Sequence, residues 1–286
     1  MGKRIRCCPK TDAARQRNRI VISDTHAGCQ MAVCPPCGIA LDGGGIYVPS
    51  RVVQTLWKWW QEFWYEWVPR VTHGEPFSVV HNGDALDGRH HGSVTQISQN
   101  LADQQKMAVI LLKPIVDLCE GNYYHIRGTE AHVGASAEQE EMLAHALGAI
   151  QDKDGLYSRN ELYIRTGKAL CHFTHHIGST GSSSYESTAV YKEMVEAFVE
   201  AGRWNDRPPQ VIVRSHRHRQ FETRIAVDEG YGISLVSPGW QLRTPFCYRL
   251  GMKQSLPQIG GYVLRQGDEE FYARFFVKSL SRTEEA

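Results

Sequence analysis

Five short polar segments, each placed directly after an apolar run, constrain the fold of this chain more than any other feature. The apolar runs occupy residues 19–23, 77–81, 122–127, 169–174 and 210–214. Short runs of this kind, closed by Gly, Asn or Ser, are typical of buried β-strands. Because loops at strand ends display side chains on a rigid sheet, we expect the segments to form a site. They are Asp24-Thr25-His26, Asn82-Gly83-Asp84, Gly128-Thr129-Glu130-Ala131-His132, His175-His176 and Ser215-His216-Arg217-His218.

The chemistry of these segments indicates bound metal. A mixture of Asp and His ligands suits Mn²⁺, Fe²⁺, Zn²⁺, Co²⁺ or Ni²⁺ better than Ca²⁺ or Mg²⁺ alone. A carboxylate has two oxygens, so Asp84 can bridge two ions. Two ions roughly 3.5–4 Å apart can clamp the attacking and leaving oxygens of a phosphoryl group and lower the pKa of a bound water. Alternate residues of an extended segment point the same way, so His216 and His218 can face the same ions, as can Asp24 and His26.

The order and spacing of the segments resemble the calcineurin-like metallophosphoesterase superfamily. The motifs of that family run D-x-H, G-D-x-x-D, G-N-H-D/E, a lone His after a strand, and G-H-x-H. The resemblance covers about residues 19–240. The matching segments are Asp24-Thr25-His26, Gly83-Asp84-Ala85-Leu86-Asp87, Gly128-Thr129-Glu130-Ala131-His132, His175 and Ser215-His216-Arg217-His218.

The resemblance implies two metal sites that share one carboxylate. The first ion would be held by Asp24, His26, Asp84 and His218. The second would be held by Asp84, a residue of the third motif, His175 and His216. His175 is preferred to His176, because the first His after the strand is the usual ligand in the family.

The third motif departs from the family pattern. Our interpretation is that Glu130 replaces the Asn ligand and that His132 replaces the His that assists the leaving group. A Glu ligand adds negative charge, which tightens metal binding and weakens the Lewis acidity of the ion. Asp87, also placed in the catalytic set, is expected to orient a ligand rather than to touch metal.

The implied fold is α/β, a two-sheet β-sandwich flanked by helices. Residues 1–18 are expected to form a flexible basic arm, and residues 19–280 a single domain. Within this domain, residues 28–69 comprise a loop over the site and a Trp-rich helix that Ser50 caps and Pro69 ends. Further helices are predicted at 98–119, interrupted by Pro114, at 137–150 and at 185–201. Strands are predicted at 232–236, 261–265 and 270–277.

The implied activity is that of a dinuclear metal-dependent phosphoesterase, in which a metal-bound hydroxide attacks a phosphodiester. The Gly-Thr-Glu-Ala-His variant resembles phosphoesterases of bacteriophage genomes, which favours DNA or a nucleotide as substrate. Two alternatives stay open: a phosphomonoesterase acting on protein or nucleotide, and a metal-stabilised scaffold with little catalysis. For residues 89–91, contact with a substrate phosphate and a solvated polar loop are equally good interpretations. The expected substrate contacts are Asn82, Arg89, His90, His91 and His176.

The cysteines and tryptophans raise two further hypotheses. A structural zinc ion needs four ligands; Cys29, Cys34 and Cys37 offer three, and Cys7 or Cys8 would have to supply the fourth. Five of the seven tryptophans fall within residues 50–69 at helical spacing, which predicts burial against the sheet. Because the aromatic residues cover more than one face, some could serve a homo-oligomer.

Composition sets modest bounds. The formal net charge of +1 implies no general attraction to nucleic acid, and 42% hydrophobic with 22% charged residues is ordinary for a globular protein. No apolar run approaches the length of a membrane helix, and no secretory signal pattern opens the chain. We therefore expect a cytoplasmic protein with no membrane partner.

Overall fold

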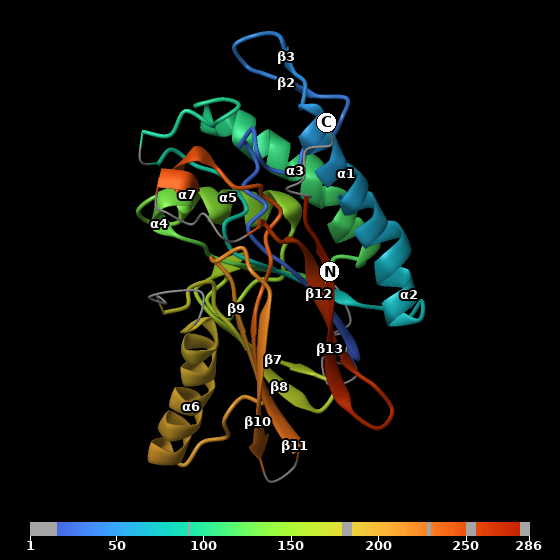
Figure 1. Ribbon diagram of the computed structural model, residues 1–286, viewed down its shortest axis with the longest axis vertical. Coiled ribbons are helices and arrows are strands. Elements are labelled where there is room, and N and C mark those ends of the chain that lie inside the picture. The colour runs from blue at the N-terminus through green and yellow to red at the C-terminus, as the bar shows by residue number, and fades with distance from the viewer. Residues whose placement is uncertain (1–15, 91, 179–184, 228–229, 250–255, 281–286) are drawn as a thin grey trace, which may run out of the picture.

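Two β-sheets packed face to face form the centre of the molecule (Figure 1). The computed structural model describes residues 16–90, 92–178, 185–227, 230–249 and 256–280. The first sheet has parallel strands at its middle and antiparallel strands at one edge. Its order is β13 (Phe271–Lys278), β12 (Ile259–Gln266), β1 (Asn18–Ile22), β4 (Ser78–Asn82), β5 (Tyr123–Ile126) and β6 (Ser158–Arg159).

The second sheet has a parallel core of three strands with an antiparallel strand at each edge. Its order is β10 (Phe221–Val227), β11 (Gly230–Val236), β9 (Val211–Arg214), β8 (Ala169–Phe173) and β7 (Leu162–Thr166). All five strands predicted to precede the polar segments are present, each within one or two residues of its expected bounds. The sequence reading missed β7 and β10, two antiparallel edge strands that are only half-buried.

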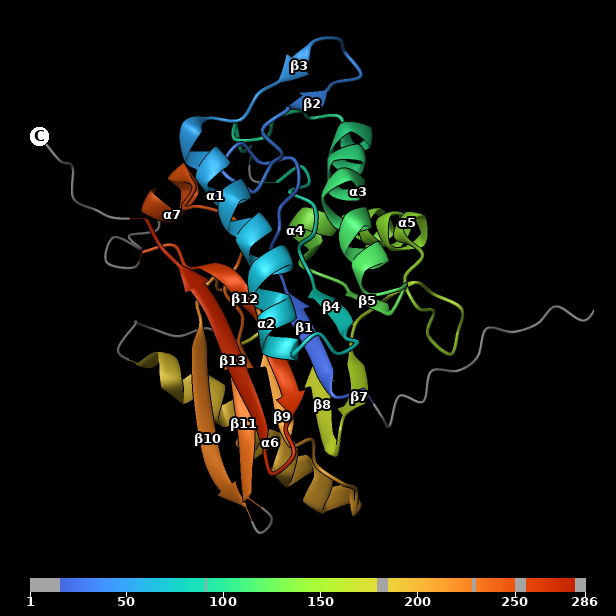
Figure 2. The same ribbon diagram turned by 90° about the vertical axis from the view of Figure 1, so that its right-hand side faces the viewer.

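The alternation of side chains along β1 explains the layers. Val21 faces the second sheet and packs in the core between the sheets with Phe173 and Val213. Ile20 and Ile22 face the other way, into a core shared with helices. These helices are α1 (Arg51–Glu62), α3 (Leu101–Leu118) and α5 (Glu138–Leu147), while α6 (Glu186–Trp204) covers the outer face of the second sheet (Figure 2). The expected fold class, an α/β two-sheet sandwich flanked by helices, is confirmed.

The Trp-rich helix is longer than predicted. Pro69 does not end it, because α1 passes through a π-helical turn, η2 (Phe63–Trp67), into α2 (Val68–Thr72), and Pro69 lies in the first turn of α2. Proline is tolerated there because it directly follows the π-helical turn, in which the Val68 N–H bonds to the Phe63 carbonyl five residues back. The helix ends at His73, whose φ of 57° is left-handed. Pro114 likewise lies inside α3 without ending it.

The tryptophans of this helix face the interior. Trp60, Trp64 and Trp67 are buried, and Trp57 and Trp59 pack partly buried against the same core. Trp60 contacts Trp240 edge to face, with ring centroids 4.7 Å apart. Burial against the sheet therefore accounts for the aromatic pattern, and homo-oligomerisation through this helix stays a prediction.

The insertion after the first polar segment contains two short strands, and its expected position over the site stays a prediction. It carries a small hairpin of β2 (Ile39–Ala40) and β3 (Ile46–Tyr47) that projects from one end of the molecule (Figures 1 and 2). The hairpin is fixed to the start of α3, where Asp103 accepts a hydrogen bond from Asp42 N at 2.8 Å and Lys106 donates to the Ala40 carbonyl at 3.0 Å.

Candidate metal centre

The carboxyl ends of the parallel strands bring the predicted segments together. Asp24 and His26 follow β1, and Asp84 follows β4 of the same sheet. His175 follows β8, and His216 and His218 follow β9 of the second sheet. Parallel strands end at one edge of their sheet, so the two sheets present these side chains to each other at the same end of the sandwich.

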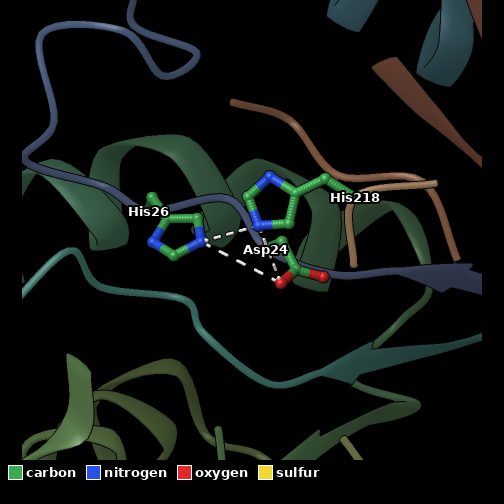
Figure 3. A group of neighbouring side chains, drawn as sticks. All are labelled: Asp24, His26 and His218. Atoms are coloured by element: carbon green, nitrogen blue, oxygen red, sulfur yellow. Dashed lines mark hydrogen bonds and ion pairs between the residues drawn. The ribbon is translucent and has the colours of Figure 1, made fainter. Parts of the chain in front are cut away.

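Asp24, His26 and His218 form one group with the geometry of metal ligands (Figure 3). Asp24 Oδ1 lies 3.1 Å from His218 Nε2 and 3.9 Å from His26 Nε2. The two imidazole Nε2 atoms are 3.1 Å apart. Ser23 Oγ donates to Asp24 Oδ2 at 2.5 Å, which leaves Oδ1 for the group.

Asp84, His175 and His216 form a second group. Asp84 Oδ2 is 3.0 Å from His175 Nε2 and 3.9 Å from His216 Nδ1. His175 Nδ1 lies 2.7 Å from the Asn82 carbonyl, which can only accept, so Nδ1 carries the proton and Nε2 is left to bind a ligand. The structure thus places His175 in the group, while the exposed His176 lies beside it.

The two groups adjoin at Asp84. This carboxylate also lies within ligand range of His26 and His132, and Asp24 Oδ1 is 3.9 Å from His175 Nε2. Gly83 and Gly128 make the approach possible, because a Cβ on Gly83 would collide with the His175 ring and one on Gly128 with the Asp84 carboxylate.

The residues present fit divalent cations. Asp24 Oδ1 and His175 Nε2 are buried and make no hydrogen bond of good geometry within the described residues. Burial of His175 disfavours its charged form, yet the carboxylates of Asp84 and Asp24 outweigh burial and raise its pKa to about 10. Asp24 is also buried, and His218 and His175 hold its pKa below the usual range. Ligand atoms that converge in this way require positive charge between them.

Backbone strain gathers at the same residues. Nine non-glycine residues of the described chain have left-handed φ angles, and five of them are ligand candidates. Such backbones persist only where the surrounding structure enforces them, and they concentrate at functional sites. The five are Asp24, His26, Asp84, His216 and His218, with φ of 54°, 41°, 54°, 71° and 50°.

Asp87 and His132 both lie against His26 of the first ligand group. The Asp87 carboxylate accepts a hydrogen bond from Gln96 at 2.9 Å and lies 3.5 Å from His26 Nδ1, a placement suited to orienting that ring. His132 Nδ1 is 2.6 Å from the Asp87 carbonyl, which fixes the proton on Nδ1. Burial and the neighbouring His26 lower the pKa of His132 to about 4.

The structure does not bring Glu130 into either group. Glu130 is the exposed first residue of α4 (Glu130–Val133), and it belongs to none of the ligand groups formed by the described residues. Thr129 is the residue of this motif that contacts Asp84. Its N–H and hydroxyl donate to Asp84 Oδ1 at 2.7 Å and 3.0 Å. The sequence signal for Thr129 was its place directly after Gly128, where the family motif carries Asn.

Glu140 is a second residue that sequence reasoning missed. It is fully buried on α5 and accepts hydrogen bonds from Ala85 N at 3.0 Å and Gly128 N at 2.6 Å. It therefore joins the loop that carries Asp84 to the loop that follows β5. Its sequence signal is a carboxylate on the apolar stripe of the helix, in line with the buried Leu143 and Leu147.

The expected substrate contacts have mixed placements. Asn82 is buried and donates to the Thr174 carbonyl and to Ser215 Oγ, so it ties two loops together and does not face an open site. Arg89 donates to the Gln99 carbonyl at 2.5 Å, and His90 Nε2 lies 3.5 Å from Asp87. His91 lies outside the described residues.

The cysteines give no support to a structural zinc. Cys29 and Cys34 are buried, Cys37 is exposed, and within the part of the chain that the structure describes they do not form a ligand group. Burial raises the pKa of both Cys29 and Cys34 to about 12, which disfavours the thiolate that zinc requires. Cys7 and Cys8 lie outside the described residues.

The fold and the site define a two-sheet α/β protein with a cluster of Asp and His side chains at the carboxyl ends of its strands. No protein-family model matches the chain, and neither does any curated protein sequence. None of the helices in the described residues has the length and apolar character needed to span a bilayer.

Several solved structures are similar to this chain at low sequence identity. A conserved uncharacterized protein from Streptococcus pneumoniae, described as a predicted phosphoesterase, is 12% identical, with 93% of this chain and 98% of that one covered and a TM-score of 0.36. Vacuolar Protein Sorting 29 from Cryptosporidium parvum is 12% identical, with 92% and 98% covered and a TM-score of 0.35. The sulfate thiohydrolase SoxB from Thermus thermophilus is 12% identical, with 92% and 56% covered and a TM-score of 0.37.

Proposed function

We propose that this protein is a metal-dependent phosphoesterase that uses two divalent ions to hydrolyse a phosphodiester of a nucleic acid or a nucleotide. One observation carries the proposal: two groups of three Asp and His ligands adjoin at the single carboxylate of Asp84. A shared carboxylate between two such groups is the arrangement that two-ion phosphoryl chemistry needs. The motif resemblance supports the same conclusion.

Each ion would take ligands from both sheets. Asp24, His26 and His218 would hold the first together with Asp84, and Asp84, His175 and His216 would hold the second. When bound, the ions would acidify a water molecule and neutralise charge on the phosphoryl oxygens. The ligand types favour Mn²⁺, with Fe²⁺, Zn²⁺, Co²⁺ and Ni²⁺ as alternatives.

The other residues of the site orient these ligands and handle the proton. The Asn82 carbonyl sets the tautomer of His175, and Asp87 sets the angle of His26. Thr129 holds the Asp84 carboxylate through its N–H and hydroxyl. His132 is the remaining imidazole within reach of His26 and Asp84, and its unprotonated Nε2 would first take a proton from a water molecule and then pass it to the leaving oxygen.

The test is hydrolysis of bis-p-nitrophenyl phosphate by protein reconstituted with Mn²⁺. We expect turnover that EDTA abolishes and that Asp84→Asn lowers by at least about 100-fold, because the shared carboxylate is lost. Asp154→Asn, in an exposed loop, is the matched control and should keep full activity.

Two other outcomes would change the proposal. If two ions bind per chain and only p-nitrophenyl phosphate is hydrolysed, the protein is a phosphomonoesterase. If two ions bind and neither ester is hydrolysed, the phosphoesterase proposal is wrong and the ions serve the fold.

A further inference from the structure

A cleft of about 370 Å³ opens beside the second ligand group. His175 and His176, at the end of β8, form one part of its wall. Arg127, Glu130 and Asn160 line it from the loops after β5 and β6. The volume lies in the range of sites that take small organic ligands. Because His175 belongs to both the cleft and the metal centre, an ester held at Asp84 can place its organic group in this cleft.

Arg127 and Glu130 both line the cleft, but they differ in their contacts with the rest of the protein. Arg127 is committed to the protein, since Nε donates to Ser158 Oγ at 2.9 Å and Nη2 lies 3.7 Å from Glu141. Glu130 is exposed, and its carboxylate makes no hydrogen bond or ion pair with another described residue. The cleft therefore offers a carboxylate that is free to accept hydrogen bonds.

We propose that this cleft binds the organic group of the substrate, and that Glu130 selects a sugar-bearing group, free or as part of a nucleoside. The inference rests on the proposed phosphoesterase function. A free carboxylate accepts strong hydrogen bonds from hydroxyl groups, and it repels a second phosphate. The amide of Asn160 adds a donor and an acceptor on the same wall. Glu130 thus takes the role of a specificity residue in place of the ligand role expected from the motif.

The test compares Glu130→Gln with the unaltered protein on three p-nitrophenyl esters in the presence of Mn²⁺. They are bis-p-nitrophenyl phosphate, the ester of thymidine 5′-phosphate and the ester of ribose 5-phosphate. We expect KM for the two sugar esters to rise roughly 10-fold with kcat little changed, because Gln keeps one acceptor oxygen but loses the charge that strengthens the hydrogen bond. Bis-p-nitrophenyl phosphate, which has no hydroxyl, should be hydrolysed equally by both proteins. A KM effect on both sugar esters identifies the sugar as the recognised group, and an effect on the thymidine ester alone identifies the nucleoside.

Two controls separate this inference from the function on which it rests. Asp154→Asn removes an exposed carboxylate that does not line the cleft, so its KM values should not change. Binding of thymidine and of ribose, measured by calorimetry on the metal-loaded protein, gives a readout without turnover. Equal effects of Glu130→Gln on all three esters, or unchanged binding of both sugars, would overturn the inference and leave the phosphoesterase intact. Binding that depends on Glu130 in a protein with no turnover would instead overturn the phosphoesterase function and keep the cleft.

Discussion

Single atoms decide the chemistry of this site. His132 is fixed with its proton on Nδ1 by the Asp87 carbonyl, so Nε2 is the nitrogen that can exchange a proton with a substrate. The same residue lies edge to face with His26, with centroids 4.5 Å apart, which places it against the first ligand group. If His132 protonates the leaving oxygen, its loss should affect poor leaving groups most, whereas loss of a purely structural residue should affect all leaving groups equally.

We predict that His132→Gln lowers kcat in proportion to how poor the leaving group is. Loss of a proton donor should cost roughly 100–10,000-fold for an alkyl ester, and much less for p-nitrophenolate, which leaves without a proton. The measurement is kcat for a series of aryl and alkyl phosphodiesters. A uniform loss across the series would show that His132 supports the metal centre and does not transfer a proton.

A buried histidine outside the centre should contribute to the pH dependence of stability. Burial and the neighbouring Arg214 lower the pKa of His172 from 6.5 to about 4. The folded state keeps this ring neutral. Above about pH 6.5 the unfolded chain is also neutral at this residue, so its ionisation takes nothing from the free energy of unfolding. Between about pH 6.5 and 4 the unfolded chain takes up a proton that the folded chain does not, and stability falls as the pH falls.

His172→Phe should flatten that fall, because the ring still stacks on Tyr163, whose centroid is 4.2 Å away, but no longer titrates. The difference in slope should approach about 1.4 kcal/mol per pH unit in the steepest region. Urea unfolding of the metal-free protein at pH 7 and at pH 5 measures it. Parallel curves for the two proteins would contradict the assignment.

At the scale of elements, helix α5 carries two adjacent carboxylates with different duties. Glu140 bonds to Ala85 N and Gly128 N, in the loops that border the metal centre. Glu141 accepts hydrogen bonds from Tyr157 N and Ser158 N, at the start of β6. Each joins a helix to backbone N–H groups, but only Glu140 acts on the candidate centre.

This pair allows a matched experiment. In Glu140→Gln the side-chain amide can accept from one N–H but presents its own N–H to the other, so we expect at least about 10-fold weaker Mn²⁺ binding and an altered Co²⁺ absorption spectrum. Glu141→Gln should lower the melting temperature and leave both metal readouts unchanged. If the two variants lose metal affinity equally, Glu140 contributes only general stability.

Sequence patterns located elements better than they located side chains. The five strands and their polar ends followed from short apolar runs, since burial dictates both. The place of Glu130 outside both ligand groups did not follow from the third motif, because the start of α4 at Glu130 depends on local hydrogen bonding that a motif does not encode. The helix was predicted to end at Pro69, but it continues past this proline through a π-helical turn that directly precedes it. Glu140 needed the packing of α5, whose partners lie 12 and 55 residues away in the chain.

At the scale of the whole molecule, each ligand group draws on both sheets. Asp24 and His26 come from the first sheet and His218 from the second, while Asp84 comes from the first and His175 and His216 from the second. A bound ion would therefore cross-link the two layers of the sandwich. Metal binding should stabilise the entire domain, because the layers share one apolar core.

We predict that Mn²⁺ at a thousandfold excess over its Kd raises the free energy of unfolding by about 4 kcal/mol for each ion bound. Differential scanning calorimetry with and without EDTA measures the effect, and hydrogen exchange should show protection in β1, β4, β8 and β9 together. In Asp84→Asn the rise should be largely lost. An equal rise in that variant would place the stabilising ion elsewhere.

Five of the six candidate ligands occupy left-handed backbone, at roughly 1–2 kcal/mol each for a residue with a side chain. Substitution by glycine at each of those positions would relieve the backbone conformation and raise the stability of the fold. Every such gain would delete a ligand. A selection for heat resistance alone would therefore erode the site before the rest of the fold, and variants recovered from it should be screened for metal content before they are called improved.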